Sequence, residues 1–299
     1  MEIKFIDREN SKECIEKVYG DKAIELLYET SVGKMISGAL ASRLVSKVYG
    51  GQQDSAGSKK KIKPFIENYS INMDEFLPEE GRDESDPYSS FNQFFIRRFR
   101  EGKRNFSNVS SDFSSPCEAR YFAYDQLTSE DSIPVKGSLW DAKALLKNDD
   151  IAKDFEGGPA LLARLCPVDY HRFHFPDSGK VIESYPVHGA FHSVNPIALK
   201  ANQNIFKDNE RFVSIIETEN FGKIAYVEVG AMMVGKIIQS HSGKIFNKGD
   251  EKGYFLFGGS TVIVFGEKGK WSPSKDILDN TRNGIETYVK LGATLGAKI

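Results

Sequence analysis

The chain has 299 residues, of which 40% are hydrophobic and 27% charged, and its formal net charge is −2. This composition is typical of a globular protein with enough apolar side chains for a sizeable core. A nearly balanced charge without a basic stripe argues against a nucleic-acid partner. No CxxC pair occurs, which argues against a disulfide framework or a structural zinc site and favours a reducing, cytoplasmic compartment; the cysteines are Cys14, Cys117 and Cys166.

The first third of the chain is predicted to be helical. Between residues 24 and 48, apolar residues recur at roughly helical spacing, with lysine and arginine between them. Such a helix would pack on the rest of the protein or lie in a membrane interface. No segment approaches the roughly 20 apolar residues of a membrane span, and the amino terminus lacks the apolar block of a signal peptide. We therefore expect a soluble or peripherally attached protein with a helical, candidate membrane-associating region at 1–109.

Two shorter features follow in this region. Four lysines lie between residues 59 and 63, and near an anionic membrane each could contribute up to ~1 kcal/mol. Acidic residues between 74 and 86 make a solvated charge run the alternative interpretation. The segment 91–99 is rich in aromatic residues and ends in a basic cluster, which indicates a packed helix or strand.

Beyond about residue 110 the pattern changes to short alternating apolar segments. Examples are residues 211–217, 223–229 and 254–257, which are separated by Gly, Asn and Asp. Their close spacing favours an antiparallel sandwich or barrel, and the segment 274–291 is expected to hold one short helix. The predicted fold class is therefore α+β, with the helical region followed by a β-rich, sandwich-like or barrel-like domain at 110–299, which the resemblance described below implies to be the catalytic domain.

The segment 254–265 contains two strand-like apolar runs that meet at Gly258-Gly259-Ser260-Thr261. Glycine adopts positive φ without steric cost, so the first interpretation is a hairpin or tight bend. The alternative is chemical, because Gly259 offers the least hindered carbonyl to a neighbouring hydroxyl. Ser260 would then be an internal nucleophile that cuts the chain before itself.

A second group of reactive side chains lies between residues 166 and 176. His171 and His174 could suggest half a metal site, but no third ligand is placed by spacing, and the prolines at both ends indicate an extended or turned stretch. We predict no metal. The other histidines lack such neighbours and are interpreted as packing or surface residues; they are His188, His192 and His241.

Five blocks of sequence, in this order, resemble the phosphatidylserine decarboxylase proenzymes. The resemblance covers about residues 110 to 265 and extends more weakly upstream through 91–98 and 135–138. The blocks are Asp169 to His174, Ser193 to Pro196, Asn209 to Arg211, Glu228 to Ala231, and Gly258 to Thr261.

The resemblance implies a self-made cofactor. In this family the serine of the GGST motif attacks the preceding glycine carbonyl, and β-elimination leaves a covalent pyruvoyl group. Carried over, the cut lies between Gly259 and Ser260, Ser260 becomes the pyruvoyl group and forms a Schiff base with the substrate amine, and neither metal nor pyridoxal phosphate is needed. The products would be a large chain, 1–259, and a small chain, 260–299, with 299 − 259 = 40 residues.

The resemblance also implies roles for three further residues. His174 matches the histidine of the family's Asp-His-Ser relay for the cut, and His171 matches the histidine of the decarboxylation step. The relay acid departs from the family pattern, because Glu118 stands where the family has aspartate. Glutamate can orient a histidine, although its extra methylene moves the carboxylate. Asp125 and Asp169 are nearby alternatives.

The function implied by the resemblance is decarboxylation of phosphatidylserine to phosphatidylethanolamine and CO2. The expected partners are this lipid, the membrane surface and the chain's own two fragments, with a homo-oligomer left open and no nucleic acid. The expected location is the cytoplasmic side of the cell membrane, as a peripheral protein. Two alternatives are a pyruvoyl decarboxylase of a soluble amino acid and an unprocessed, non-enzymatic lipid-binding homologue.

Overall fold

The computed structural model describes six parts of the chain. The predicted helix at 24–48 lies outside them, as do Gly258 and Gly259. The described residues are 3–17, 51–127, 142–194, 204–231, 236–257 and 260–299.

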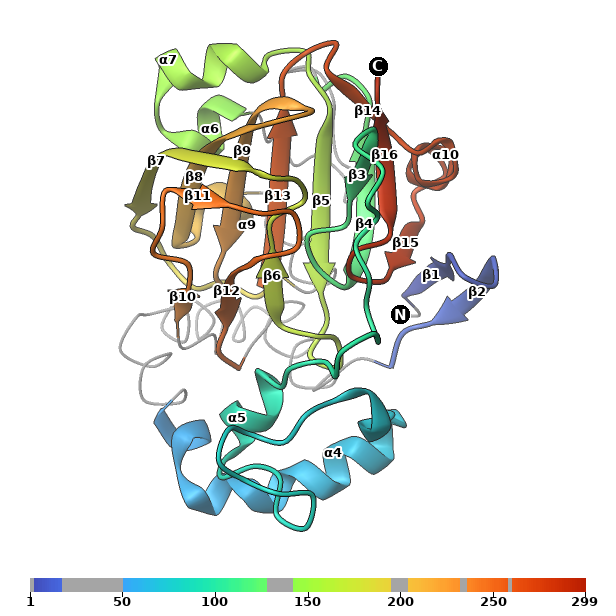
Figure 1. Cartoon of the computed structure of the whole chain (residues 1–299), viewed down its shortest axis with the longest axis vertical. Helices are drawn as coiled ribbons and strands as arrows, with labels where there is room; N and C mark the ends of the chain where they lie inside the picture. Colours follow the sequence, from blue (N-terminus) through green and yellow to red (C-terminus); the bar gives the residue numbers. More distant parts are fainter. Residues whose placement is uncertain (1–2, 18–50, 128–141, 195–203, 232–235, 258–259) are drawn as a thin grey trace, which may run out of the picture.

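A ten-stranded sheet forms the centre of the molecule (Figure 1). Neighbouring strands run antiparallel except for the pair β1 and β15, which is parallel. The sheet is open, because its edge strands are β11 and β2. In sheet order, the strands are β11 (Ile245–Phe246), β7 (Gly179–Val187), β8 (Arg211–Thr218), β9 (Gly222–Val229), β13 (Ser260–Gly266), β5 (Ala160–Leu165), β4 (Ala119–Tyr124), β15 (Glu286–Val289), β1 (Lys4–Asp7) and β2 (Lys12–Ile15).

Two three-stranded sheets pack on this large sheet. Their inner side chains join one core, in which Phe113 stacks on Trp271 and Phe173 contacts Tyr226 of β9. Burying such aromatic side chains is the largest favourable contribution to folding. The first small sheet contains β10 (Ile237–Gln239), β12 (Glu251–Phe255) and β6 (Arg172–His174), and the second contains β14 (Trp271–Pro273), β16 (Thr294–Lys298) and β3 (Asp112–Ser114).

Short helices lie around the β region (Figure 1). The helix α10 (Lys275–Arg282) packs on β4 and β15 and confirms the short helix expected between residues 274 and 291. At the upper end of the view in Figure 1 lie α6 (Ala142–Leu146), α7 (Asp149–Ala152) and the 3-10 helix η3 (Lys153–Phe155), while α9 (Ile205–Asp208) packs on α6.

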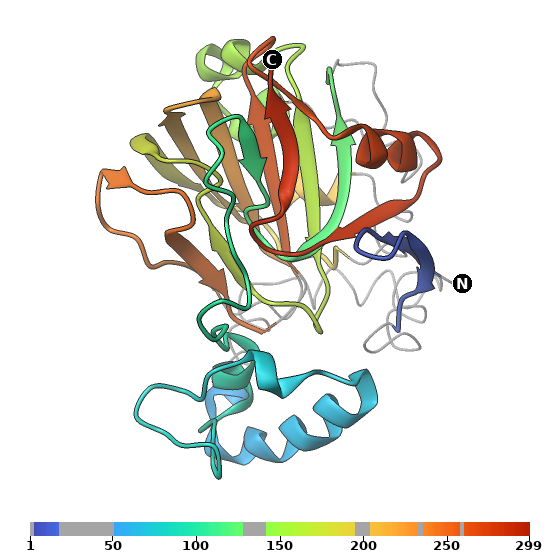
Figure 2. The same ribbon diagram turned by 45° about the vertical axis from the view of Figure 1, so that its right-hand side comes forward.

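A separate helical layer lies beneath one end of the sheets, as Figures 1 and 2 show. Its own apolar cluster includes Phe65, Phe94 and Phe95, and Phe257 from the β region is part of the same cluster. This shared cluster attaches the layer to the end of β12. The layer contains η1 (Ala56–Lys61), α4 (Ile62–Tyr69), η2 (Met73–Glu75) and α5 (Phe91–Phe95).

The observed fold confirms the α+β class and the predicted strands at 211–217 and 223–229. The strand expected at 254–257 begins earlier, at Glu251, and ends at Phe255. The hairpin interpretation of the segment 254–265 is wrong, because β12 pairs with β6 and β10 whereas β13 pairs with β5 and β9. No barrel is closed by the described strands. Within the six described parts of the chain, no helix is long and apolar enough to span a membrane.

The start of the chain also differs from the helical region expected at 1–109. Residues 4–15 form the hairpin β1–β2, and β1 pairs in parallel with β15 near the other end of the chain. This pairing covers the edge of β15, which would otherwise expose unpaired backbone groups. The α4–α5 layer matches the helical expectation, and the amino-terminal hairpin belongs to the β region.

Candidate active site

Ser260 is the first residue of β13, and its side chain is fully buried. Its position is set by the sheet on both sides, because Ser260 is paired with Leu165 of β5 and Thr261 with Val229 of β9. A nucleophile at the start of a central strand is held by the backbone ladder, so its hydroxyl can be aimed accurately.

The hydroxyl of Ser260 meets the imidazole of His171. The distance from Oγ to Nδ1 is 3.0 Å, and Nε2 lies 2.8 Å from the carbonyl oxygen of Cys166. A carbonyl oxygen only accepts, so Nε2 carries the hydrogen and Nδ1 presents its lone pair to the serine hydroxyl. Ser260 therefore donates its hydrogen bond to His171, which is the geometry of a nucleophile beside a base.

His171 is fully buried beneath an aromatic ring. The ring of Phe95 from α5 stacks on the imidazole, with the centroids 3.9 Å apart and an angle of 26° between the planes. Burial lowers the pKa of His171 to about 3, although its hydrogen bond to Cys166 opposes this effect. The imidazole is therefore neutral at physiological pH, and its Nδ1 lone pair is available.

The turn between residues 166 and 171 fixes the carbonyl that orients His171. The carboxylate of Asp169 accepts a hydrogen bond from the N–H of Cys166 at 2.7 Å, and the N–H of Asp169 donates to the Cys166 carbonyl at 2.8 Å. Arg120 holds the same carboxylate at 2.6 Å. Asp169, an alternative relay acid from the sequence, thus stabilises the turn that carries His171.

A buried group of charged side chains supports this turn from the sheet. Arg164 binds the carboxylates of Glu16 and Glu286 at 2.7 and 2.5 Å, and Glu16 also lies 3.0 Å from Arg120. Burial by itself raises the pKa of Glu16, but Arg164 and Arg120 outweigh this effect and lower the pKa to about 2. The amino-terminal segment thereby supplies a carboxylate to the framework of the site.

His174 lies on β6 and has different partners. Its Nδ1 lies 2.8 Å from the carbonyl oxygen of Gly249, so Nδ1 carries the hydrogen, and its Nε2 lies 3.2 Å from the hydroxyl of Tyr170. Its backbone N–H donates to the carbonyl of Pro116 at 2.7 Å, which brings β6 beside the segment that contains Glu118. Burial lowers the pKa of His174 as well.

The carboxylate of Glu118 is held by other groups. It accepts hydrogen bonds from Arg104 Nε at 2.5 Å and from the hydroxyl of Tyr288 at 2.7 Å. The structure thus brings Ser260 and His171 together, whereas the observed hydrogen bonds of the His174 and Glu118 side chains lead to other residues. The relay of Ser260, His174 and Glu118 stays a prediction. Asp125, the other alternative acid, accepts a hydrogen bond from Ser272 at the surface.

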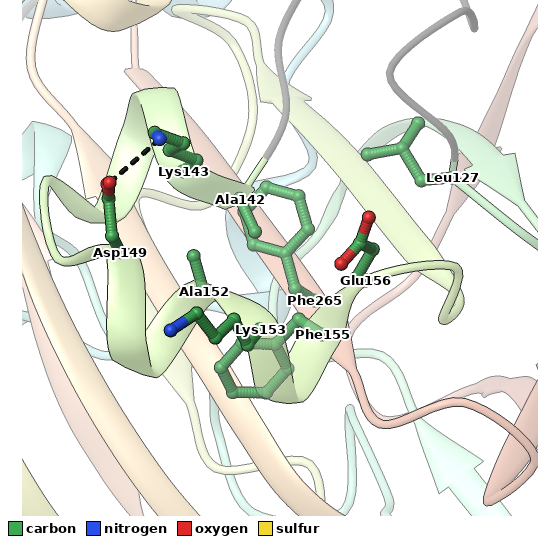
Figure 3. A pocket seen from close by; sticks show the side chains of 9 residues that line it. All are labelled: Leu127, Ala142, Lys143, Asp149, Ala152, Lys153, Phe155, Glu156 and Phe265. Atoms are coloured by element: carbon green, nitrogen blue, oxygen red, sulfur yellow. Dashed lines mark ion pairs between the residues drawn. The ribbon is translucent and has the colours of Figure 1, made fainter.

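Two cavities help to delimit the site. Figure 3 shows a pocket that includes Phe265, which lies five residues beyond Ser260 on β13, or about 17 Å at the usual rise of a strand. This pocket is remote from the serine. A second cavity, of about 320 Å³, lies against the 166–171 turn and is lined by charges of both signs, from Arg97, Arg104, Arg120, Glu75, Glu118 and Asp169.

The remaining predicted features have no part in this geometry. His188 is largely exposed and lies 3.9 Å from Glu210, and His241 packs edge-on against Phe175. The backbone N–H of His192 donates to the Asn209 side chain. Among the residues with described positions, no group of three or more His, Cys, Asp and Glu side chains could hold a metal ion.

Sequence reasoning missed the contribution of Phe95 and of the Cys166 carbonyl. Phe95 stands 76 positions before His171, so no local sequence pattern links the two rings. Every residue has a backbone carbonyl, so the residue type at position 166 does not indicate that its carbonyl binds His171. The aromatic segment 91–99 indicated that something packs there, and the structure shows that its partners include His171 and Phe257.

Comparisons with known proteins identify the family of the chain. The family model described as phosphatidylserine decarboxylase matches residues 91–297. A phosphatidylserine decarboxylase proenzyme from Clostridium novyi is 41% identical over 99% of this chain and 100% of its own length. Proenzymes of the same name from Clostridium kluyveri and Fusobacterium nucleatum are 40% and 38% identical, over 99% and 98% of this chain and 99% and 97% of their own lengths. The chain therefore belongs to the phosphatidylserine decarboxylase family, a family of carboxy-lyases.

Proposed function

We propose that this protein cuts itself between Gly259 and Ser260, converts Ser260 into a pyruvoyl group, and decarboxylates phosphatidylserine to phosphatidylethanolamine and CO2. The observation that carries the proposal is the buried hydrogen bond of 3.0 Å between Ser260 Oγ and His171 Nδ1. It supports an activated hydroxyl at the junction that the sequence singled out. The names of the relatives, all proenzymes, support both the processing and the lipid substrate.

The cut needs only the chain and one water molecule. Ser260 Oγ bonds to the carbonyl carbon of Gly259, the peptide C–N bond breaks, and the nitrogen keeps the proton that leaves the hydroxyl. Loss of the Ser260 α-proton then expels the Gly259 carboxylate from the β-carbon, and water releases the nitrogen as ammonia, leaving a ketone. The Nδ1 lone pair of His171 faces the hydroxyl whose proton must move.

The buried serine and its neighbours fit the resulting group. A pyruvoyl ketone supplies the electron sink that decarboxylation of an α-amino acid requires. His171 lies beside the position of that ketone and is its nearest titratable side chain along the observed hydrogen bonds. Because burial disfavours the charged imidazole, a proton accepted at Nδ1 is readily returned, which suits a group that donates a proton to the reacting carbon.

The substrate and the location are proposed on chemical grounds. A phosphatidylserine headgroup carries an ammonium, a carboxylate and a phosphate, and the cavity beside the 166–171 turn offers charges of both signs. The substrate is a membrane lipid, so we place the protein at the cytoplasmic side of the cell membrane as a peripheral protein. The exposed side chains of Lys60 and Lys63 in the helical layer would favour an anionic surface.

Intact mass spectrometry tests the proposal. The purified protein is measured with and without borohydride and phosphatidylserine vesicles. Two chains that correspond to 1–259 and 260–299, the smaller with a pyruvoyl end and a reducible lipid adduct, are expected. A single 33.5 kDa chain after long incubation would contradict the cut and favour a non-enzymatic lipid-binding protein. A cut protein that decarboxylates a soluble amino acid and ignores vesicles would contradict only the lipid substrate.

A further inference from the structure

The helix α5 contacts the segment just before the predicted cleavage junction and also the imidazole that faces Ser260, through two residues that the proposed chemistry has not used. Asn92 binds the backbone just before the junction, and Phe95 stacks on His171. We propose that Asn92 is a positioning residue for self-cleavage. This inference rests on the proposed function, because it assumes the cut between Gly259 and Ser260.

Asn92 is 1% exposed, and both ends of its amide are engaged. Its Oδ1 accepts the backbone N–H of Phe257 at 2.9 Å, and its Nδ2 donates to Asp54 Oδ1 at 2.7 Å. An ionised carboxylate only accepts, so Asp54 fixes the Nδ2 end of the amide. The orientation that presents Oδ1 to Phe257 is therefore determined by the network.

Three successive backbone N–H groups before the glycines are held in place. Phe255 donates to the carbonyl of His171 at 2.9 Å, and Leu256 donates to the carbonyl of Lys236 at 3.1 Å. Both of these acceptors are backbone atoms of the β region. The third N–H, that of Phe257, is instead held by a side chain from the helical layer.

The ring of Phe257 is held by the same helix. It packs against Phe91 and Phe95 with centroid distances of 5.0 Å in both cases and nearly perpendicular planes. Phe95 also stacks on the imidazole of His171 at 3.9 Å. One helix thus contacts the strand that delivers the scissile bond and the imidazole that faces the nucleophile.

The physical reason for such an anchor is conformational entropy. Ser260 is fixed by the sheet, and two glycines separate it from Phe257. Glycine has the largest conformational freedom of any residue, so a carbonyl in this connection meets the hydroxyl productively only when both ends are fixed. Asn92 fixes Phe257, the last residue before the glycines, and Asp54 in turn orients Asn92.

The rate of the cut tests this role. Chain made by cell-free translation is sampled over time, and the fraction of uncut chain is measured on denaturing gels. Asn92→Ala removes the acceptor of a buried N–H, and we expect the cut to slow by about tenfold or more. Gln93→Ala is the matched control, because it shortens the neighbouring amide side chain of the same helix and should cut at the wild-type rate.

A rescue separates positioning from general damage to the fold. Asn92→Asp alone places two carboxylates 2.7 Å apart and should cut slowly. Combined with Asp54→Asn, it restores a carboxylate–amide pair with the polarity reversed, and one carboxylate oxygen still accepts the Phe257 N–H. We expect the double variant to regain most of the wild-type rate.

A second measurement is independent of the chemistry. In the uncuttable Ser260→Ala background, Asn92→Ala should speed hydrogen exchange at the Phe257 amide while the protected amides of β13 and β5 stay protected. A wild-type cutting rate for Asn92→Ala, or a slow double variant whose Phe257 amide is protected, would overturn the inference. If the wild-type chain is never cut, the result contradicts the proposed function itself, and with it the role of Asn92 that depends on the cut.

Discussion

His171 and His174 are both histidines and lie only three residues apart, but their imidazoles lie in different environments. The first faces Ser260 and the ring of Phe95, and the second faces Gly249 and Tyr170. In an extended stretch, residues separated by an odd number of positions point to opposite sides. The 172–174 strand therefore directs the two imidazoles away from each other, whereas a helix would have placed them on one face.

The two imidazoles also carry their hydrogens on opposite nitrogens. His171 donates from Nε2 to Cys166, which leaves Nδ1 free to accept from Ser260. His174 donates from Nδ1 to Gly249 and accepts at Nε2 from Tyr170. One backbone carbonyl thus selects the tautomer of each ring, and the position of that carbonyl decides which nitrogen can act as a base.

The largest effect is expected when the Ser260 hydroxyl is removed, because this hydroxyl contacts His171 and is not a partner of His174. Ser260→Ala deletes the hydroxyl bound to His171 and leaves the partners of His174 intact. We expect one full-length chain, no pyruvoyl group and no CO2 release, measured by intact mass and by trapping labelled CO2. Any cut at the 259–260 bond in this variant would place the nucleophile elsewhere. Asn68→Ala, a change on the exposed side of α4, serves as the control.

The next largest effect is expected for His171→Ala on decarboxylation. Loss of a positioned acid or base typically costs ~10²- to 10⁴-fold, so processed protein should release CO2 that much more slowly. The rate is expressed per mole of cut chain, which separates lost turnover from a slower cut. Normal turnover in the processed variant would remove His171 from the decarboxylation step.

His174→Ala tests the relay that the family resemblance implies. We expect the uncut chain to accumulate, and time-resolved gels with His171→Ala alongside give the comparison. If His174→Ala cuts at the wild-type rate while His171→Ala does not, the base for the cut is the histidine that directly contacts Ser260. Such a result would assign both steps to one imidazole.

Glu118 should have a smaller influence on the cut. Its carboxylate binds Arg104 and Tyr288, so Glu118→Asp preserves the charge but shortens the reach to both. We expect slower processing in Glu118→Asp and slower processing still in Glu118→Ala. Processing of Glu118→Ala at the wild-type rate would show that another group orients the relay histidine, and thermal melting in the Ser260→Ala background reports any loss of fold.

The smallest effect concerns pH. Burial lowers the pKa of His171 to about 3, so this imidazole gains a proton in the folded precursor only at a pH well below the ordinary histidine pKa. Burial lowers the pKa of His174 as well. If His171 is the base for the cut, the rate should therefore show no histidine titration between about pH 5 and 8. A step with a midpoint near the ordinary histidine value would mean that the reacting imidazole is exposed or ionised.

Local sequence patterns predicted much of the fold and part of the candidate site. Alternating apolar residues predicted β8 and β9, and the GGST junction singled out Ser260, because each signal lies within a few adjacent residues. Two prolines correctly indicated that the segment with His171 and His174 is turned and extended.

The remaining features depend on contacts between distant segments. β1 pairs with β15 at the other end of the chain, and Asn92 binds a backbone N–H 165 residues later. Periodicity shows which face of a strand is buried and leaves its partner strand unspecified. For the same reason the hairpin interpretation of residues 254–265 was wrong, since both runs look like strands and only the tertiary fold assigns them to different sheets.

The division of β12 and β13 between two sheets affects how the mature, cut protein can refold. The 40 residues after the proposed cut would contain β13, an interior strand between β9 and β5, and also β15 and β16 of two further pairings. Neither fragment could complete its sheets alone. The precursor would therefore fold as a single chain before it is cut. Once the mature protein unfolds, its two chains would have to find each other as separate molecules in order to refold.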